Sequence, residues 1–522
     1  MMSWSQARSI GLAAGGAVAV AAAIVAYAEG HGPGGAAKAL LAAAIAVAIA
    51  AFATTLPGIT LRGTVIGGLF VLAGFSTWTS TGHPLVIWAI LAVAGAILAV
   101  WSWPWFARLP ALPRLGTAWL GLAYWLFGIL GAVLTVHLKV AAQRVAYAGV
   151  FTLAALAIVA TVRRPDRGST GTATTGEPGA TRDGRDPSVG MAAAILVGIA
   201  LLLLAGSATL FDSVHAIPNQ DPSTVLMRDR FWGGPGLYFH PNSMAGLAIV
   251  AAIRIGPDRA FAAWQRLAAT VIAGFVLYES NSRIGFVFAV AAAVVHAALF
   301  LLRRFAPSRT PAGLPRYRRT WVAVAAPFAV VALVLALSGG QGFLTQSRFG
   351  GDDMSSGRLD TWRQVYTDWK AGGPAEKLFG DPRTSRAVVV RSGSDRQLNT
   401  DNAAVGAFRR GGALGLIAFV FGLLLFLWHG LRPVLRGPPR GGPPRDGPPQ
   451  DGPGRAGSAW FVVAALAVVP TIATEDWLLG GTNGGIWLVL MAGEAVVLWA
   501  GGAGGQRADE RRLTPLRQAT RR

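Results

Sequence analysis

Long runs of apolar residues, separated by short polar segments, recur along the whole chain. Each run is close to the length of about 20 residues that an α-helix needs to cross the hydrocarbon core of a bilayer. We therefore predict an all-α polytopic membrane protein with about fourteen transmembrane helices. The predicted helices are 10–27, 36–55, 64–79, 84–103, 117–137, 145–162, 189–211, 241–255, 267–279, 284–302, 321–337, 414–431, 458–472 and 486–500.

Composition supports this class. Of the 522 residues 53% are hydrophobic and only 14% are charged, whereas a soluble protein has about 25% charged residues. Such a chain cannot cover its apolar surface in water. It contains no cysteine, which excludes disulfides, thiolate metal sites and cysteine nucleophiles.

The formal net charge of +21 indicates topology rather than nucleic-acid binding. With the N-terminus inside, 29 of the 46 Lys and Arg fall in segments predicted to be cytoplasmic, as the positive-inside rule requires. Both termini are then cytoplasmic, and the inner cations face anionic membrane lipids. Arg8, the apolar stretch after it and Ala26-Tyr27-Ala28 also resemble a cleavable signal peptide. An uncleaved first helix is favoured because the next helix follows at once.

The same pattern predicts six segments along the chain. They are the N-terminal membrane helices (1–162), a disordered cytoplasmic loop (163–188), central membrane helices (189–337), a large extracytoplasmic loop (338–413), C-terminal membrane helices (414–500) and a basic cytoplasmic tail (501–522). A second disordered cytoplasmic loop is expected at 432–457.

The large outer loop contains a predicted interfacial amphipathic helix. Its apolar stripe is formed by Leu359, Trp362, Tyr366 and Trp369, spaced 3, 4 and 3 residues apart, which is a helical period. Cations beside the stripe, including Arg358, would lie at the level of the lipid headgroups.

Polar residues also cluster at the outer ends of three membrane helices. In the turn Tyr278–Gly285, Glu279 and Arg283 lie at the membrane boundary, where an ionisable residue is a functional candidate. Arg283 could instead extend to the headgroups or pair with Glu279. His240 and Asn242 open the short helix 241–255, where simple capping is the favoured role for His240.

At the end of the outer loop, Asp401 and Asn402 precede the Arg409-Arg410 pair and the next membrane helix. An Asp in this position is most often a helix N-cap. It is also placed to accept a proton from a hydroxyl group at the interface.

Four motifs together resemble the O-antigen ligase / O-antigen polymerase (Wzy-type) superfamily. They are HPNSMAGLA (240–248), SNSRIG (280–285), SGRLDTWRQVYTDW…LFGDPRTS (356–385) and TDNAAVGAFRRGGALGLIAF (400–419). Their order resembles that family too: an Asn-bearing helix, a Ser-Arg turn, one membrane helix, a basic loop, a large outer loop and a Gly-rich helix.

The resemblance implies glycosyl transfer from a polyprenyl-pyrophosphate-linked glycan outside the cytoplasmic membrane. The acceptor would be another lipid-linked repeat, a lipid A core or a protein. Family members are inverting and independent of metals or other cofactors, and arginines matching Arg283 and Arg358 would hold the pyrophosphate. Ligases carry a His before the Asn of the last motif, where this chain has Asp401. A His-based activation therefore does not transfer to this sequence.

The residues then take the following predicted roles. The base is Asp401, with Asp352 or Asp353 as alternatives, and Arg283, Arg358 and Arg410 hold the pyrophosphate. The glycan or the acceptor contacts His240, Asn242, Asn402 and Trp362. Two rivals remain. One is a polysaccharide or lipid-linked-glycan transporter, for which Glu494 and the pair Glu475-Asp476 are the only ionisable candidates. The other is a peptidoglycan polymerase of the shape and elongation family.

Overall fold

The structure is a computed structural model, and its description covers most of the predicted membrane helices. The described residues are 32–79, 93, 96–98, 100, 103–162, 186–207, 231, 233–234, 237–258, 260–280, 282–305, 358–382, 387–390, 396–399, 402–436, 453–472 and 484–499.

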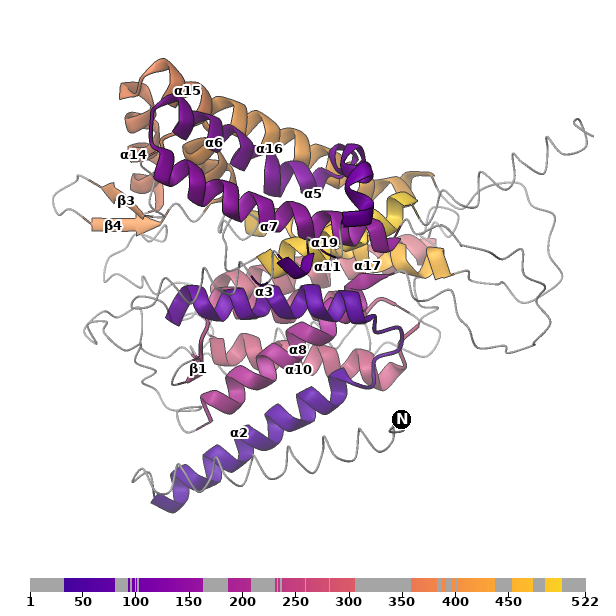
Figure 1. The fold of residues 1–522 in the computed structure, drawn as a ribbon. Helices are drawn as coiled ribbons and strands as arrows, with labels where there is room; N and C mark the ends of the chain where they lie inside the picture. Colours follow the sequence, from indigo (N-terminus) through magenta and orange to yellow (C-terminus); the bar gives the residue numbers. More distant parts are fainter. Residues whose placement is uncertain are drawn as a thin grey trace, which may run out of the picture.

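Within these residues the protein is a bundle of helices with two short hairpins (Figure 1). The helices are α2 (Gly32–Ala53), α3 (Leu61–Thr79), η2 (Trp103–Arg114), α5 (Gly116–Ala118), η3 (Trp119–Ala123), α6 (Tyr124–Leu134), α7 (Leu138–Val162), α8 (Pro187–Ala205), α9 (Pro241–Ile255), α10 (Ala263–Ser280), α11 (Arg283–Phe305), α14 (Arg358–Ala371), α15 (Pro374–Phe379), α16 (Ala403–Arg436), α17 (Pro453–Ala467), α18 (Val469–Ile472) and α19 (Gly484–Trp499). The hairpins were not predicted from the sequence. They pair β1 (Gly233–Gly234) with β2 (Leu237–Tyr238), and β3 (Ala387–Val390) with β4 (Arg396–Asn399), both antiparallel.

Eleven of the fourteen predicted membrane helices overlap a helix of the structure. Six helical segments of the described part of the chain are long and apolar enough to cross a membrane: 33–53, 116–134, 138–162, 187–205, 284–302 and 403–432. Four overlaps are with shorter apolar helices, and the eleventh is with α10. The predictions 10–27, most of 84–103 and 321–337 lie outside the described residues. The six long helices are those expected of a polytopic membrane protein, while the number of fourteen stays a prediction.

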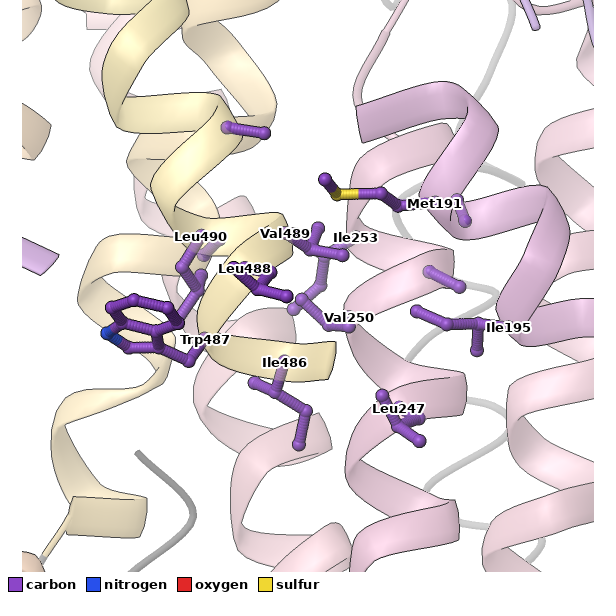
Figure 2. Close-up of a cluster of buried hydrophobic side chains, with 14 of the residues drawn as sticks. Met191, Ile195, Leu247, Val250, Ile253, Ile486, Trp487, Leu488, Val489 and Leu490 are labelled. Carbon is purple, nitrogen blue, oxygen red and sulfur yellow. The ribbon is translucent and has the colours of Figure 1, made fainter. Parts of the chain in front are cut away.

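The core of the bundle is formed where α8, α9 and α19 meet. Met191 and Ile195 of α8 lie beside Val250 and Ile253 of α9, with Val489 of α19 against them (Figure 2). Every side chain from Ile486 to Ala492 is at most 1% exposed. A helix that is apolar all round is stable only when other helices surround it, so α19 occupies the centre of the bundle.

Glycines allow α3 and α8 to approach closely. A Cβ atom added at Gly67 of α3 would lie 2.8 Å from the Cα atom of Met191, and one added at Gly190 of α8 would lie 2.6 Å from the backbone nitrogen of Thr64. Small residues at such crossings let helix backbones touch, which is how membrane helices associate without a hydrophobic driving force between them.

The polar segments at one end of the bundle lie on the same side. The hairpins, α14 and α15 are all found at the left of Figure 1. We call this side the hairpin end. It contains the start of α9, which directly follows β2, and the start of α16. The topology predicted from the sequence places the starts of both helices on the outer face of the membrane. That the hairpin end faces outward stays a prediction.

Candidate functional site at the hairpin end

The Asn-bearing helix and the Ser-Arg turn form one buried junction. The Ser282 hydroxyl donates a hydrogen bond of 2.9 Å to Oδ1 of Asn242, and its oxygen accepts one of 3.0 Å from the backbone nitrogen of Gly285. Ser282 is 0% exposed and Asn242 is 7% exposed. A Cβ atom at Gly285 would lie only 2.6 Å from Cβ of Ala245. The two motifs are therefore locked together in the fold.

Arg283 begins α11 at this junction. It directly follows Ser282, so the junction fixes the backbone from which its side chain extends. The side chain itself lies outside the described residues, and its alternative pairing with Glu279 stays a prediction.

Glu279 lies in the last turn of α10, next to this junction. Its backbone carbonyl accepts a hydrogen bond of 2.9 Å from the nitrogen of Phe231, and its side chain is 9% exposed. Oε1 of Glu279 is buried without a hydrogen-bond partner among the described residues. Only Arg266 (Nε and Nη1) and Trp460 (Nε1) share that property there. Arg266 lies in the first turn of α10, at the opposite end from Glu279, and Trp460 lies on α17. A buried polar group without a partner requires an explanation.

His240 occupies the N-cap position of α9 and Pro241 its first turn. The helix start is thus confirmed. The capping role favoured for the His240 side chain is wrong, because that side chain makes no capping hydrogen bond. Its carbonyl accepts a hydrogen bond of 3.0 Å from the nitrogen of Met244.

The predicted helix of the outer loop is α14, which Arg358 begins. Its buried side differs from the predicted stripe. Thr361 is 0% exposed and Val365 is 4% exposed, whereas Leu359 and Tyr366 are about half exposed, at 49% and 50%. The buried side of α14 is therefore formed by Thr361 and Val365, which are four residues apart. Trp362 and Trp369 lie at its edges and are only half-buried. The side chain of Arg358 lies outside the described residues.

The side chain of Asn402 caps the start of α16. Oδ1 of Asn402 accepts a hydrogen bond of 3.0 Å from the nitrogen of Val405, the N-cap pattern. The helix begins at Ala403, earlier than the predicted 414, because residues 403–411 are already helical before a break at Gly412. Asp401, Asp352 and Asp353 lie outside the described residues.

Two glycines join α15 to α16 at this break. Gly412 has φ 63° and ψ −158°, a conformation that is essentially restricted to glycine. A Cβ atom there would lie 2.4 Å from the carbonyl carbon of Leu378, and one at Gly380 (φ 89°) would lie 2.4 Å from that of Arg410. We call this contact the glycine joint.

Arg144 of α7 fastens the glycine joint to the membrane helices. Its guanidinium donates to the carbonyl oxygens of Gly128 (2.5 Å), Asp381 (3.1 Å) and Arg410 (3.4 Å). Arg144 is 5% exposed. The sequence reasoning missed this residue, although a cation one position before a predicted membrane helix was a visible signal. Arg410 is thus held through its backbone, next to the predicted site.

The ionisable residue that favoured a transporter lies elsewhere and is fully engaged. Glu494 of α19 is 0% exposed and accepts hydrogen bonds from the nitrogens of Gly116 and Thr117 (2.7 and 2.9 Å) and from the hydroxyl of Thr117 (2.6 Å). Nδ1 of His429 lies 2.6 Å from its Oε1. A carboxylate at a helix N-terminus satisfies the unpaired N–H groups there. Glu475 and Asp476 lie outside the described residues.

Comparison with known proteins confirms the family resemblance. Residues 268–371 match the family model of O-antigen ligase. The match begins in α10, includes the start of α11 with Arg283 and ends with α14. It supports a membrane protein of the O-antigen ligase/polymerase type. No curated protein and no solved structure matches the chain.

Proposed function

We propose that this protein is a membrane glycosyltransferase that moves a glycan from a polyprenyl-pyrophosphate carrier to an acceptor on the outer face of the cytoplasmic membrane. The observation that carries the proposal is the Asn242–Ser282 junction, which fixes the start of α11 and Arg283 within the segment that matches O-antigen ligase. The same match contains Arg358, at the start of α14.

The chemistry requires few groups. Asp401 removes the proton of an acceptor hydroxyl, and the resulting oxygen attacks the anomeric carbon of the donor sugar. The bond between that carbon and the phosphate oxygen breaks, and polyprenyl pyrophosphate leaves with the electron pair. A single displacement inverts the anomeric centre. Pyrophosphate is a stable anion, so this reaction does not need the second carboxyl group that acts as general acid in glycoside hydrolysis.

Arginine is suited to the leaving group. Its planar fork of donors matches phosphate oxygens, and fixed cations in a water-poor site stabilise developing charge without reorganisation. We assign this role to Arg283 and Arg358, assisted by Arg410, so that no metal ion is needed. Asp353 and Asp352 are alternative bases in the same loop.

The remaining predicted residues divide into two groups. The side-chain oxygens of Asn242 and Asn402 accept hydrogen bonds from Ser282 and from the start of α16. We therefore assign positioning roles to these two residues. His240 occupies the N-cap position of α9, and Trp362 is half-buried beside the exposed side of α14. Both stay assigned to the glycan or the acceptor.

The test is reconstitution of the full chain in liposomes with an undecaprenyl-pyrophosphate-linked oligosaccharide. We expect new glycosidic bonds, seen by mass spectrometry. Ladders of repeats identify a polymerase, and a single transfer to another lipid or protein identifies a ligase. Arg283→Ala should lower kcat by about 10²–10³-fold, the usual loss of one preorganised donor. Arg304→Ala, at the exposed far end of the same helix, is the matched control and should keep activity.

Two results would overturn the proposal. Movement of the intact lipid-linked glycan across the bilayer without bond formation would identify a transporter. Bond formation with a lipid-linked peptidoglycan precursor alone would identify the peptidoglycan polymerase class.

A further inference from the structure

A cavity of about 460 Å³ lies between α14, α15 and the start of α16, beside the glycine joint. Its walls include Asp368, Trp369, Glu376, Asp381, Phe408 and Arg409. Binding sites for small molecules have volumes of about 300–1,000 Å³, and a few polar groups among apolar walls orient the ligand. The cavity has the size and the mixed lining of such a site.

One wall is an indole ring held in a fixed orientation. Nε1 of Trp369 donates a hydrogen bond of 3.0 Å to the carbonyl of Lys377. The ring centroids of Trp369 and Phe408 are 5.2 Å apart, and Tyr366 stacks on Trp369 at 5.8 Å. A rigid aromatic platform costs little conformational entropy when it binds a ligand. The C–H faces of a pyranose ring are apolar and stack on such rings.

The charges of the lining decide which ligand fits. Three acidic residues, Asp368, Glu376 and Asp381, line the cavity together with one arginine, Arg409. Oδ1 of Asp368 also accepts a hydrogen bond of 2.7 Å from Nε2 of Gln364. A phosphate or a uronic acid would be repelled by this excess of negative charge. Carboxylates accept hydrogen bonds from hydroxyl groups, which a neutral sugar supplies in number. Among the described residues no group of three or more acidic or His side chains is arranged to hold a metal ion.

The position of the cavity indicates which substrate it serves. Phe408 lies six residues, about 9 Å along the helix, from Asn402, which neighbours the proposed base Asp401. Trp369 lies eleven residues, about 16 Å along α14, from Arg358, which is proposed to hold the pyrophosphate. Along the helices the cavity is nearer to Asn402 than to Arg358, and Arg410, which assists in holding the pyrophosphate, directly follows Arg409 of its wall. A short acceptor oligosaccharide with its reactive hydroxyl at Asp401 could extend into it.

We propose that this cavity binds a sugar without anionic substituents, as part of the acceptor glycan. The acceptor assignment rests on the proposed function, whereas sugar binding itself does not. Glu376, Asp381, Phe408 and Arg409 lie beyond the segment that matches O-antigen ligase, so the cavity is built largely from the part of this chain outside that match. The glycine joint and Arg144 hold α15 and α16 rigidly around it.

The first test measures sugar binding without any transfer reaction. Detergent-solubilised full-length protein is examined by saturation-transfer NMR with the methyl glycosides of glucose, N-acetylglucosamine and glucuronic acid as probes. We expect signals from at least one of the two neutral probes and a signal at least fivefold weaker from the glucuronide. Trp369→Leu and the double variant Asp368→Asn with Glu376→Gln should abolish the signals. Thr367→Ala, on the exposed side of α14, should retain them.

The absence of binding of both neutral probes to the wild-type protein would overturn the proposal. So would equal binding of the glucuronide, or unchanged signals in Trp369→Leu and in the double variant. Asp368→Asn and Glu376→Gln change charge without changing size, so they test the site if Trp369→Leu fails to fold.

The second test addresses the acceptor. In the reconstituted reaction, Trp369→Leu should raise the KM for the acceptor about tenfold and leave the KM for the lipid-linked donor unchanged. An unchanged acceptor KM would contradict the acceptor role. If the wild-type protein forms no glycosidic bond, the proposed function fails, and the NMR measurement still decides whether the cavity binds sugar.

Discussion

Two polar regions of the molecule use their charged residues in opposite ways. Away from the hairpin end, Arg254 at the end of α9 donates to Ser188 (2.6 Å), Asp258 (2.8 Å) and Asp186 (2.9 Å). Its guanidinium also lies over the rings of Phe261 and Trp460. At the hairpin end, Oε1 of Glu279 is buried without a partner among the described residues, and a charged cavity remains open.

The difference separates stability from function. The donors of Arg254 and the carboxylate of Glu494 are engaged by groups of the same chain. Such networks fix a fold, and removing one member leaves a buried charge unpaired. A site that acts on a substrate presents polar groups to a cavity, and the cavity at the hairpin end is lined by charged residues. The predictions below test whether activity and stability divide in this way.

The largest effect is expected for Asp401→Asn. Loss of the proposed base should lower kcat by about 10²–10⁴-fold, the usual contribution of a general base. The thermal unfolding midpoint should stay unchanged because Asn402 caps α16. Transfer rates and unfolding are measured on the same purified protein. Full activity in this variant, together with a loss in Asp353→Asn, would move the base to Asp353.

Arg254→Ala should have the opposite effect. It leaves Asp186 and Asp258 without their cation, which costs about 3–5 kcal/mol of stability for a buried pair. Thermal unfolding in detergent should show a large decrease of the midpoint, and the activity per folded molecule should be preserved. Arg114→Ala, at an exposed position, is the control and should change stability by less than about 0.5 kcal/mol.

Gly412→Ala should affect both properties. Its φ of 63° and ψ of −158° cost about 1–3 kcal/mol for a residue with a Cβ atom, and that atom would collide with Leu378. We expect lower stability and a several-fold loss of transfer, because the glycine joint positions Arg410 and the cavity. Gly149→Ala is the matched control. Open space surrounds that helical position, so stability should stay equal or rise by up to about 1 kcal/mol.

The smallest effect is expected for Ser282→Ala. Removing its hydroxyl breaks the bond to Asn242 and uncaps α11, at a cost of about 1 kcal/mol. Because Arg283 is the next residue, kcat should also fall a few-fold. A thermal shift without any change in kcat would show that the junction has no influence on Arg283.

Local pattern predicted the helices but not the contacts between them. The apolar runs defined α8 and α16 because a membrane helix satisfies its own backbone hydrogen bonds. The motifs also predicted that Asn242 and Ser282 lie on the same face. The bond from Gly116 to Glu494 joins residues 378 positions apart, and no local pattern contains it. Arg254 was counted as a topological charge, whereas the structure pairs it with two carboxylates.

The same limit applies to the site. The Gly411-Gly412 pair was visible in the sequence, but the pattern does not show that Gly412 alone has a positive φ, where its backbone lies against that of Leu378 in α15. The predicted buried side of α14 was wrong, because the contacts of this helix with β3, α15 and α16 decide which of its residues are covered. The cavity forms only when Trp369 of α14, Glu376 of α15 and Phe408 of α16 are brought together.

The most direct measurement compares Arg283→Ala with Arg254→Ala in one reconstituted preparation that contains an undecaprenyl-pyrophosphate-linked oligosaccharide. The rate of glycosidic bond formation and the thermal unfolding midpoint are determined for each variant and for the wild-type protein. We expect Arg283→Ala to lose at least a hundredfold in rate and to keep its midpoint, and Arg254→Ala to lose stability and to keep its rate per folded molecule. Full transfer activity in Arg283→Ala would contradict the account.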